Sequence, residues 1–382
     1  MSETREGRFT VRRAADITAF DRAAWDAVLD PDDLQTTHRF ISVCQDARVE
    51  AAAYRHVMVL GDGVVDAVAS FSRMDVRLEL LSPTPFRSLV GRARRWAPRL
   101  LRVPVAFCGL PVSFGRPCLA MRRGADRAAI VSVLARELQA WADEMGADIL
   151  CFKEFPPREE MDVASLASLG YFRAPSLPTC SLELRWTTFN AYVGAMRAAY
   201  RRQLEGTLHQ RECHGLTLRT VEDFGALCPA IFALYEQVMD RAPYQLERLN
   251  LQFFEGLNDL GPETSAVLLE RQGRLTAAAI LLVGPRVVTF LLAGIDYSLD
   301  RRCQAYPNLV IETVAEAIRA GATRLEMGQT SYDLKRRLGA VTEPRSLYVR
   351  FRRPVGHALL RAASGLLFPS LTLAPRRVFR AG

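Results

Sequence analysis

Residues 265–294 read SAVLLERQGRLTAAAILLVGPRVVTFLLAG, three apolar runs rich in branched side chains. The pairs Gln272-Gly273 and Gly284-Pro285 separate these runs, and Gly and Pro at such intervals mark turns between strands. The pattern therefore predicts a three-stranded antiparallel meander. It disfavours a membrane span over 276–294, because a spanning helix needs about 20 uninterrupted apolar residues.

The residues after the meander predict the rest of one folding module. Residues 306–320, YPNLVIETVAEAIRA, place apolar side chains at helical spacing, with Pro307 suited to the first turn and Gly321 to the C-cap. A short strand over 323–327, a polar turn, a short helix through Arg337 and a last strand over 346–351 follow. The predicted order is β-β-β-α-β-α-β.

An earlier part of the chain repeats this order. WADEMGADILCFKEF (141–155) followed by LASLGYFRAP (166–175) matches EAIRAGATRLEMGQT (316–330) followed by KRRLGAVTEP (335–344) segment by segment. Asp62-Gly63 also predicts a hairpin near the start of the first copy. We interpret the match as an internal duplication, with chance similarity of generic α/β segments as the alternative. The sequence therefore predicts two α/β modules, each a mixed, mostly antiparallel sheet flanked by helices.

The composition is that of a globular protein with anionic partners. The 382 residues are 49% hydrophobic and 24% charged, and the formal net charge is +8. A phosphorylated cofactor, an RNA or an acidic membrane face would fit that charge. Lysine occurs only at positions 153 and 335, so each lysine is a candidate for a task that arginine cannot perform; chance survival in an arginine-biased chain is the alternative.

Cysteine usage and the N-terminal residues predict a cytoplasmic location. The eight cysteines are scattered singly without a C-x-x-C pair, which is typical of reduced, mostly buried thiols. The charged residues 1–13 lack an apolar run, so no secretory signal is expected there. Two basic and apolar segments, 89–102 and 355–382, could instead lie on an anionic membrane surface, or pack on the core as an insertion and a docked tail.

Three segments resemble the tandem acetyltransferase-fold (GNAT) proteins: residues 188–224 (TFNAYVGAMRAAYRRQLEGTLHQRECHGLTLRTVEDF), the hairpin over 267–284 (VLLERQGRLTAAAILLVG) and residues 291–340. The similarity is greatest to the Fem-like, peptidoglycan-biosynthesis-type N-acyltransferases, and it is most evident over 186–353. It implies a GNAT-like domain over 8–180, a second one over 181–354 that carries the active site, and a basic amphipathic tail over 355–382. It also implies transfer of an acyl or aminoacyl group to an amine, from acyl-coenzyme A (acyl-CoA) or a charged tRNA.

The donor phosphates are expected at the turn Asp300-Arg301-Arg302-Cys303-Gln304-Ala305. This turn leads into the helix beginning near Pro307, whose free N–H groups favour anions. Arg301 and Arg302 could add bidentate contacts, with Tyr306 and Asn308 in the first helical turn. A solvated turn is the alternative, since the loop has no glycines and no Q/R-x-x-G-x-G/A motif. The choice between CoA and tRNA therefore stays open.

Acyl transfer also needs a group that removes a proton from the amine. Glu326 on the strand after the helix, and Asp296 at the end of the meander, are the candidate bases. A desolvated carboxylate there would have the raised pKa that a base near neutral pH requires, and an ion pair between Glu326 and an arginine is the alternative.

Stabilisation of the developing oxyanion or the leaving group needs donors. Tyr297, Tyr306 and Tyr332 are candidate donors, and Lys335 lies one helical turn from Tyr332. We expect Lys335 to hold a carboxylate, a phosphate or the oxyanion, and we expect Glu326, Tyr297 and Lys335 to converge in one cleft.

The residues allow two other functions. Residues 192–214 predict a basic helix that is either a solvated face or a contact for phosphates, and the second reading favours a tRNA-dependent aminoacyl transferase. A non-catalytic membrane-surface protein would use the basic tail. No metal is expected, because His209, Cys213 and His214 lack a fourth ligand at the usual spacing. The favoured acceptor is an amine on a small molecule or a cell-envelope precursor.

Overall fold

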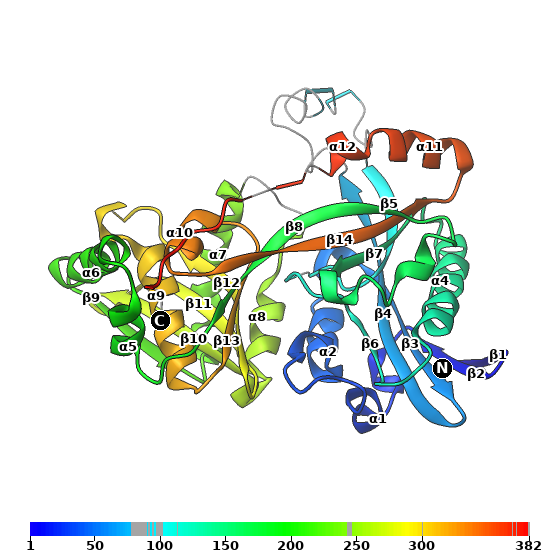
Figure 1. Ribbon diagram of the computed structural model, residues 1–382, viewed down its shortest axis with the longest axis horizontal. Helices are drawn as coiled ribbons and strands as arrows, with labels where there is room; N and C mark the ends of the chain where they lie inside the picture. Colours follow the sequence, from blue (N-terminus) through cyan, green and yellow to red (C-terminus); the bar gives the residue numbers. More distant parts are fainter. Residues whose placement is uncertain are drawn as a thin grey trace. The chain divides into compact units, whose positions relative to one another are not determined.

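The computed structural model describes residues 1–77, 90, 92, 93, 95, 96, 102–112, 114–242, 247–299, 301–368, 370, 371 and 373–380. These residues form two compact units, shown in Figure 1. Unit 1 comprises Met1–Leu177, Tyr244–Leu249 and Pro344–Leu371, and unit 2 comprises Pro178–Pro243, Asn250–Glu343 and Thr372–Gly382.

Unit 1 is built on a mixed sheet. Strands β1 to β5 pair antiparallel in sequence order, β6 adds to β4, β5 pairs parallel with β7, and β7 pairs antiparallel with β14. Its strands are β1 (Ser2–Glu6), β2 (Phe9–Ala14), β3 (Ala53–Gly61), β4 (Val64–Arg77), β5 (Arg102–Cys108), β6 (Leu119–Met121) and β7 (Ile149–Phe155). Its helices include α1 (Arg22–Asp26), α2 (His38–Asp46), α4 (Arg127–Glu144), α11 (Pro354–Ala362) and α12 (Ser364–Leu367).

Two apolar clusters hold the sheet of unit 1 together. The larger cluster packs the apolar side of α4, including Leu138 and Trp141, against the strands. The smaller cluster lies at Cys151 and packs Leu360 of α11 together with Phe107 of β5. Successive side chains of a strand point to opposite faces, so β7 contributes to both clusters and is buried along its whole length.

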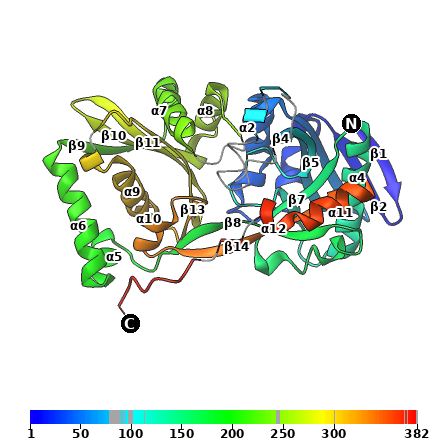
Figure 2. The ribbon, with the colours of Figure 1, turned by 90° about the horizontal axis from the view of Figure 1, so that it is seen from above.

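Unit 2 has the same plan. Strands β9 (Leu216–Val221), β10 (Thr264–Arg271), β11 (Arg274–Val283) and β12 (Val287–Ile295) pair antiparallel, β12 pairs parallel with β13 (Arg324–Gly328), and β13 pairs antiparallel with β8 (Phe172–Glu183). The helices are α5 (Phe189–Ala195), α6 (Ala198–Cys213), α7 (Cys228–Arg241), α8 (Leu251–Asn258), α9 (Ala305–Arg319) and α10 (Tyr332–Arg337). In Figure 2, α7 and α8 cover one face of this sheet and α9 covers the other.

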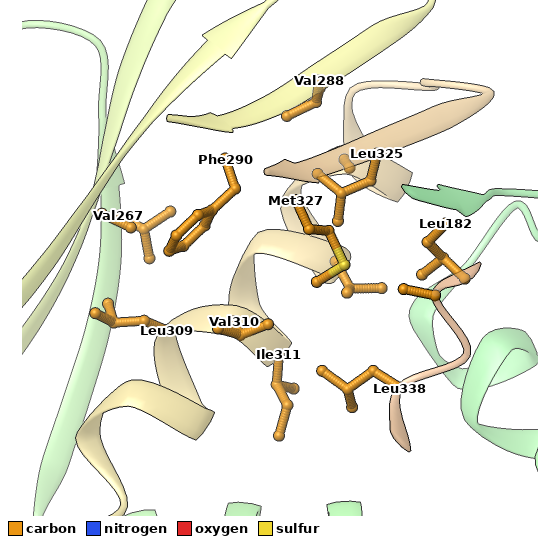
Figure 3. Close-up of a cluster of buried hydrophobic side chains, with 14 of the residues drawn as sticks. Leu182, Val267, Val288, Phe290, Leu309, Val310, Ile311, Leu325, Met327 and Leu338 are labelled. Carbon is orange, nitrogen blue, oxygen red and sulfur yellow. The ribbon is translucent and has the colours of Figure 1, made fainter. Parts of the chain in front are cut away.

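The core of unit 2 lies between α9 and the strands. Figure 3 shows Leu309, Val310 and Ile311 of α9 in one cluster with Phe290, Leu325 and Met327 of the sheet, and all six side chains are buried. Each such side chain contributes about 1.5–3 kcal/mol through burial. The helix ends where Gly321 (φ 71°) donates from its N–H to the carbonyl of Ile318. The core therefore fixes the position of the N-terminus of α9 relative to the ends of β12 and β13.

The predicted fold class is confirmed, and most predicted elements occur within a few residues of their predicted bounds. The meander is β10–β12, the predicted helix over 306–320 is α9, and Asp62 and Gly63 both have positive φ in the predicted hairpin. The division of the chain into contiguous domains over 8–180, 181–354 and 355–382 stays a prediction. The compact units are not contiguous, because β14 (Val341–Phe351) pairs with β7 of unit 1 over its distal half.

One predicted helix, over 192–214, is two helices. It breaks at Met196 and Arg197, whose backbones are extended. The reason is the C-terminal segment, because the Arg197 N–H donates to the carbonyl of Val378 and the Arg380 N–H donates to the carbonyl of Ala195. Periodicity within the segment could not reveal a partner that lies at the other end of the chain.

The last described residues, 373–380, dock on unit 2. Val378 is only 2% exposed, and the ring of Phe379 lies 4.6 Å from Trp186 between centroids and 5.8 Å from Tyr192. Phe379 also occupies the space that a Cβ at Gly339 would need. For these residues the docked-tail alternative describes the structure. Among the described residues, no helix is both long enough and apolar enough to cross a bilayer.

Candidate functional site

A strained turn follows β13 in unit 2. Gly328, Thr330 and Ser331 all have left-handed backbones, with φ of 65°, 67° and 47°. For Thr and Ser this conformation is costly and persists only where the surroundings enforce it. The enforcing group is Lys335 of α10, whose Nζ donates to the carbonyls of Gln329 and Thr330 at 3.0 Å each. One side chain thus fixes the whole turn.

Burial controls the electrostatics of Lys335. The side chain is 2% exposed, and desolvation lowers its pKa from 10.5 to about 8, an effect that nearby Cys180 opposes. The sequence predicted a lysine that holds a ligand anion, whereas the structure commits two of the three ammonium donors to backbone carbonyls. Lys335 therefore acts on the site through the turn that it positions.

Tyr306, in the first turn of α9, reaches the same turn. Burial raises the pKa of its hydroxyl, and a hydrogen bond with Ser331 partly offsets this rise, while Cys180 and Tyr297 are close enough to add to it. The ring packs 6.4 Å from that of Phe290. A phenol with a raised pKa stays protonated at neutral pH, so Tyr306 can donate a proton to a leaving group at the end of β13.

The other two tyrosines are placed differently. The Tyr332 hydroxyl donates to the carbonyl of Pro178 at 2.9 Å, which ties α10 to β8. Tyr297 is 43% exposed, and the guanidinium of Arg241 lies 4.5 Å from its ring centroid.

The candidate base Glu326 lies in an ion pair. Its carboxylate is 3.7 Å from Nε of Arg324, two residues earlier on the same face of β13. The backbone of Glu326 lies opposite Thr289 of β12. The ion pair that was the alternative interpretation is therefore what the structure shows.

Asp296 differs from the expectation of a raised pKa. Burial pushes the pKa of this carboxyl upwards, but hydrogen bonds from the N–H and hydroxyl of Ser298 and the charge of Arg274 outweigh that effect, and the net pKa is lowered. The Ser298 hydroxyl lies at 2.6 Å and the guanidinium of Arg274 at 2.9 Å. Asp296 organises the turn after β12 and is a weaker base than an ordinary aspartate.

The strand register separates the two carboxylates. Glu326 pairs with Thr289, and Asp296 lies seven residues farther along the chain from Thr289. At about 3.3 Å per residue this is roughly 20 Å of extended strand. The structure therefore does not bring Glu326 together with Asp296 and Tyr297. It groups Tyr306, Ser331, Cys180 and Lys335 at the end of β13 instead.

The turn before α9 gives this helix no side-chain cap. Gln304, the N-cap residue, has a left-handed backbone (φ 49°) and makes no side-chain cap to the helix. Asn308 is fully buried and donates from Nδ2 to the carbonyls of Cys303 and Gln304, so it holds the turn rather than a ligand. Arg301 and Arg302 are exposed beside this end, and Asp300 lies outside the described residues.

Helix α6 runs beside this turn. The Thr207 hydroxyl donates to Oε1 of Gln304 at 2.8 Å, and farther on Arg211 lies 3.7 Å from Glu312. The two helices therefore run in the same direction, and the first half of α6 extends past the N-terminus of α9. Arg201 and Arg202 lie in that half and Arg197 is its N-cap residue, so this end of α6 carries three cationic side chains.

Sequence reasoning missed Thr207, Ser331 and Cys180. No spacing relates Thr207 to Gln304 or Cys180 to Lys335, because the contacts join segments far apart in the chain. The dipeptide Thr330-Ser331 before a helix gave the only local signal, and it reads as an ordinary capping sequence. No group of three or more potential metal-binding side chains occurs in the part of the chain that the structure describes.

A family comparison agrees with the fold. Residues 194–336 match the family model described as "Acetyltransferase (GNAT) domain", which confirms the predicted class, a GNAT-type acyltransferase domain, for this part of the chain. Two curated Mycobacterium tuberculosis proteins, both named "Putative 8-amino-7-oxononanoate synthase 2", are 26% identical over 266 residues. The match covers 67% of this chain but only 34% of those proteins, so the chain spans about a third of their length.

Solved structures share the tandem GNAT fold. FemX aligns over 92% of this chain and 100% of its own, with a TM-score of 0.58 and 10% identity. The C-terminal domain of a putative lysylphosphatidylglycerol synthetase from Agrobacterium fabrum covers 93% and 98%, with a TM-score of 0.53 and 14% identity. A tandem GNAT protein from the clavulanic acid biosynthesis pathway covers 91% and 99%, with a TM-score of 0.53 and 12% identity. The predicted tandem architecture is thereby confirmed.

Proposed function

We propose that this chain, which has the tandem GNAT fold with a GNAT domain over residues 194–336, is an N-acyltransferase whose donor is an acyl-CoA. The observation that carries the proposal is the N-terminus of α9, which has no capping side chain and is flanked by Arg301 and Arg302. Free helix N–H groups and arginines together favour phosphate oxygens.

The reacting end of the donor would lie between the N-terminus of α9 and the end of β13. Tyr306 connects these two places, since it begins in α9 and reaches Ser331. We assign Tyr306 the role of donating a proton to the CoA thiolate as it leaves. The acceptor amine attacks the thioester carbon, the C–S bond breaks, and the amine loses its proton to Glu326 or to solvent.

The role of Tyr306 depends more on where its hydroxyl is held than on how strong an acid it is. Lys335 holds the turn that carries Ser331, so it controls where the Tyr306 hydroxyl points. Holding donor and acceptor at contact distance is worth more than one proton transfer in most acyl transfers. The acceptor that we propose is an amine on a small molecule or a cell-envelope precursor.

A second donor has its own supporting observation. Arg197 and Arg202 are exposed on α6 beyond the N-terminus of α9, and a row of cations of this kind also suits a polyanion such as charged tRNA. A tRNA would bind with a steep dependence on salt, because several phosphates are contacted at once. A CoA molecule carries few charges and would show a shallow dependence.

Peripheral contact with an anionic membrane is a proposal about unit 1. Val355 and Leu359, one helical turn apart on α11, are 74% and 67% exposed. Arg353 and Arg361 lie next to them in the sequence. Trp96 is 91% exposed, while most of the predicted segment 89–102 lies outside the described residues. Binding to vesicles without any acyl transfer would favour a non-catalytic role.

The deciding experiment compares donors. The purified chain is incubated with a panel of acyl-CoA species and with charged tRNA, and mass spectrometry records which donor is consumed. The pair Arg301→Ala and Arg302→Ala should weaken CoA binding about 5- to 30-fold, since each exposed contact is worth about 1 kcal/mol. Arg219→Ala is the matched control, because Arg219 is an exposed arginine of β9 that pairs with Glu270 of β10. Consumption of tRNA alone would replace the CoA proposal.

A further inference from the structure

Each unit brings one lysine to the region where the corresponding strand ends, Lys153 within β7 of unit 1 and Lys335 on α10 after β13 of unit 2, and the chain has no other lysines. In the repeat, Lys153 of β7 aligns with Gly328 of β13. Lys335 reaches back to the carbonyls that follow Gly328, so its ammonium group lies at the corresponding position in unit 2. In a chain whose other cations are all arginine, this coincidence indicates a position that requires a compact ammonium group.

Lys153 lies where two parallel strands separate. The last registered pair of β5 and β7 is Cys108 with Phe152, so Lys153 is the first residue beyond it. Its side chain crosses Gly109 of the neighbouring strand, where an added Cβ would approach Lys153 Cε to 2.7 Å. Gly109 also has φ of 144°, which a side chain would strain. Ligands bind α/β sheets at such separations, outside the carboxyl ends of parallel strands.

The ammonium group of Lys153 has no acceptor among the described residues. The side chain is 8% exposed and its Nζ lies 5.1 Å from the centroid of the Phe107 ring, while its charge opposes the rise that burial causes in the pKa of the Cys108 and Cys151 thiols. The neighbouring carboxylate of Glu154 accepts instead from the Ser176 hydroxyl at 2.9 Å. A cation–π contact offsets only part of the loss of hydration, so Lys153 retains unused donors.

The surroundings of Lys153 are apolar on one side. Alternation along β7 puts Lys153 on the face of Cys151, which packs in the cluster that includes Phe107 and Phe368. A group that binds there would meet an ammonium at one end and apolar side chains beside it. Lys335, with two carbonyl partners, offers no comparable unfilled donors.

We propose that Lys153 is the anion-binding group of a second ligand site in unit 1, which takes an oxyanion, a phosphate or carboxylate, carried on an apolar group. The oxyanion accepts from the Lys153 ammonium, and the apolar part packs beside Phe107. The site is separate from the one at the N-terminus of α9 and does not depend on acyl transfer by unit 2.

The test uses the scarcity of lysine. Full-length chain grown with ¹³C,¹⁵N-lysine gives two lysine side-chain signals in NMR, and Lys153→Arg assigns them. Octyl phosphate, octanoate and inorganic phosphate are titrated separately. We expect the Lys153 signal to shift saturably with octyl phosphate or octanoate, at lower concentrations than with inorganic phosphate, while the Lys335 signal stays in place. The two amphiphiles distinguish a phosphate from a carboxylate head group.

Lys153→Met supplies the second readout. Loss of one charge-assisted contact should weaken the preferred amphiphile about tenfold, measured by calorimetry. Without ligand the variant should melt at a higher temperature than the unsubstituted chain, because a buried ammonium has been removed. An unmoved Lys153 signal with all three probes would overturn the proposal, as would equal shifts at both lysines. Inorganic phosphate binding as tightly as octyl phosphate would overturn the apolar part.

Discussion

Replacing Lys335 with methionine should make the protein more stable and less active at neutral pH. Burial lowers the pKa of Lys335 from 10.5 to about 8, which is the cost of keeping the ammonium out of water. One pKa unit corresponds to about 1.36 kcal/mol, so this cost is about 3 kcal/mol. Methionine keeps the length of the side chain without the charge. It leaves the carbonyls of Gln329 and Thr330 without their donor, at about 1 kcal/mol each.

The pH dependence identifies the cause. Below about pH 8, Lys335 is charged in the folded and unfolded chains, and the full cost applies. Between about pH 8 and 10.5 the folded chain holds a neutral amine while the unfolded chain still binds the proton, so Lys335 raises the stability as pH rises. The difference in unfolding free energy, unsubstituted chain minus Lys335→Met, should therefore increase by about 3 kcal/mol across this window.

The assay is urea denaturation of both chains at a series of pH values. Tyr306 and Cys180, whose pKa values are raised by burial, make the fold less stable as pH rises over the same range. The contribution of Tyr306 cancels in the difference, whereas a small contribution from Cys180 remains because the charge of Lys335 lowers the pKa of that thiol. At pH 7 the variant should gain about 1 kcal/mol while its turnover falls, because the turn to Ser331 has lost its anchor. A difference that does not change with pH, or full turnover by the variant, would refute the reasoning.

Three further changes test the packing around the site. Thr207→Val removes the hydrogen bond to Gln304 and should weaken CoA binding a few-fold in calorimetry, while the melting temperature changes by only a few degrees. Unchanged CoA binding would show that α6 does not help to position the donor turn. Phe379→Ala should cost about 2–3 kcal/mol in urea denaturation, and a smaller loss than 1 kcal/mol would contradict the docking of residues 373–380. Gly294→Ala should cost about 1–3 kcal/mol, since its Cβ would approach the backbone N of Tyr235 to 2.7 Å; an unaffected variant would show that α7 can shift freely.

The arrangement of the elements could be predicted because it depends on local patterns. The turns at Gln272-Gly273 and Gly284-Pro285 and the period of α9 suffice to give the order of strands and helices of unit 2. Strand alternation also makes Glu326 face away from Leu325 and Met327, and both apolar neighbours are buried in the core with α9. Such features require only the geometry of strands and helices.

The roles of side chains depend on partners far away in the chain. Nothing near Lys335 in the sequence shows that its ammonium group turns back onto two carbonyls, and nothing near Asp296 shows that Arg274 and Ser298 lower its pKa. Composition did single out the two lysines, and both are buried, Lys153 within β7 and Lys335 on the helix that follows β13. The rarity of lysine thus indicated that these residues occupy buried positions, but it did not indicate which groups their ammonium groups contact.

The central claim is that the N-terminus of α9 holds the phosphates of an acyl-CoA. Hydrogen–deuterium exchange with and without CoA measures this directly, since the N–H groups of Ala305 and Tyr306 would become hydrogen-bonded to the ligand. We predict slower exchange in a peptide covering 301–310, with loss of the effect when Arg301 and Arg302 are both alanine. Unchanged exchange in that peptide, with CoA bound and other peptides protected, would contradict the account.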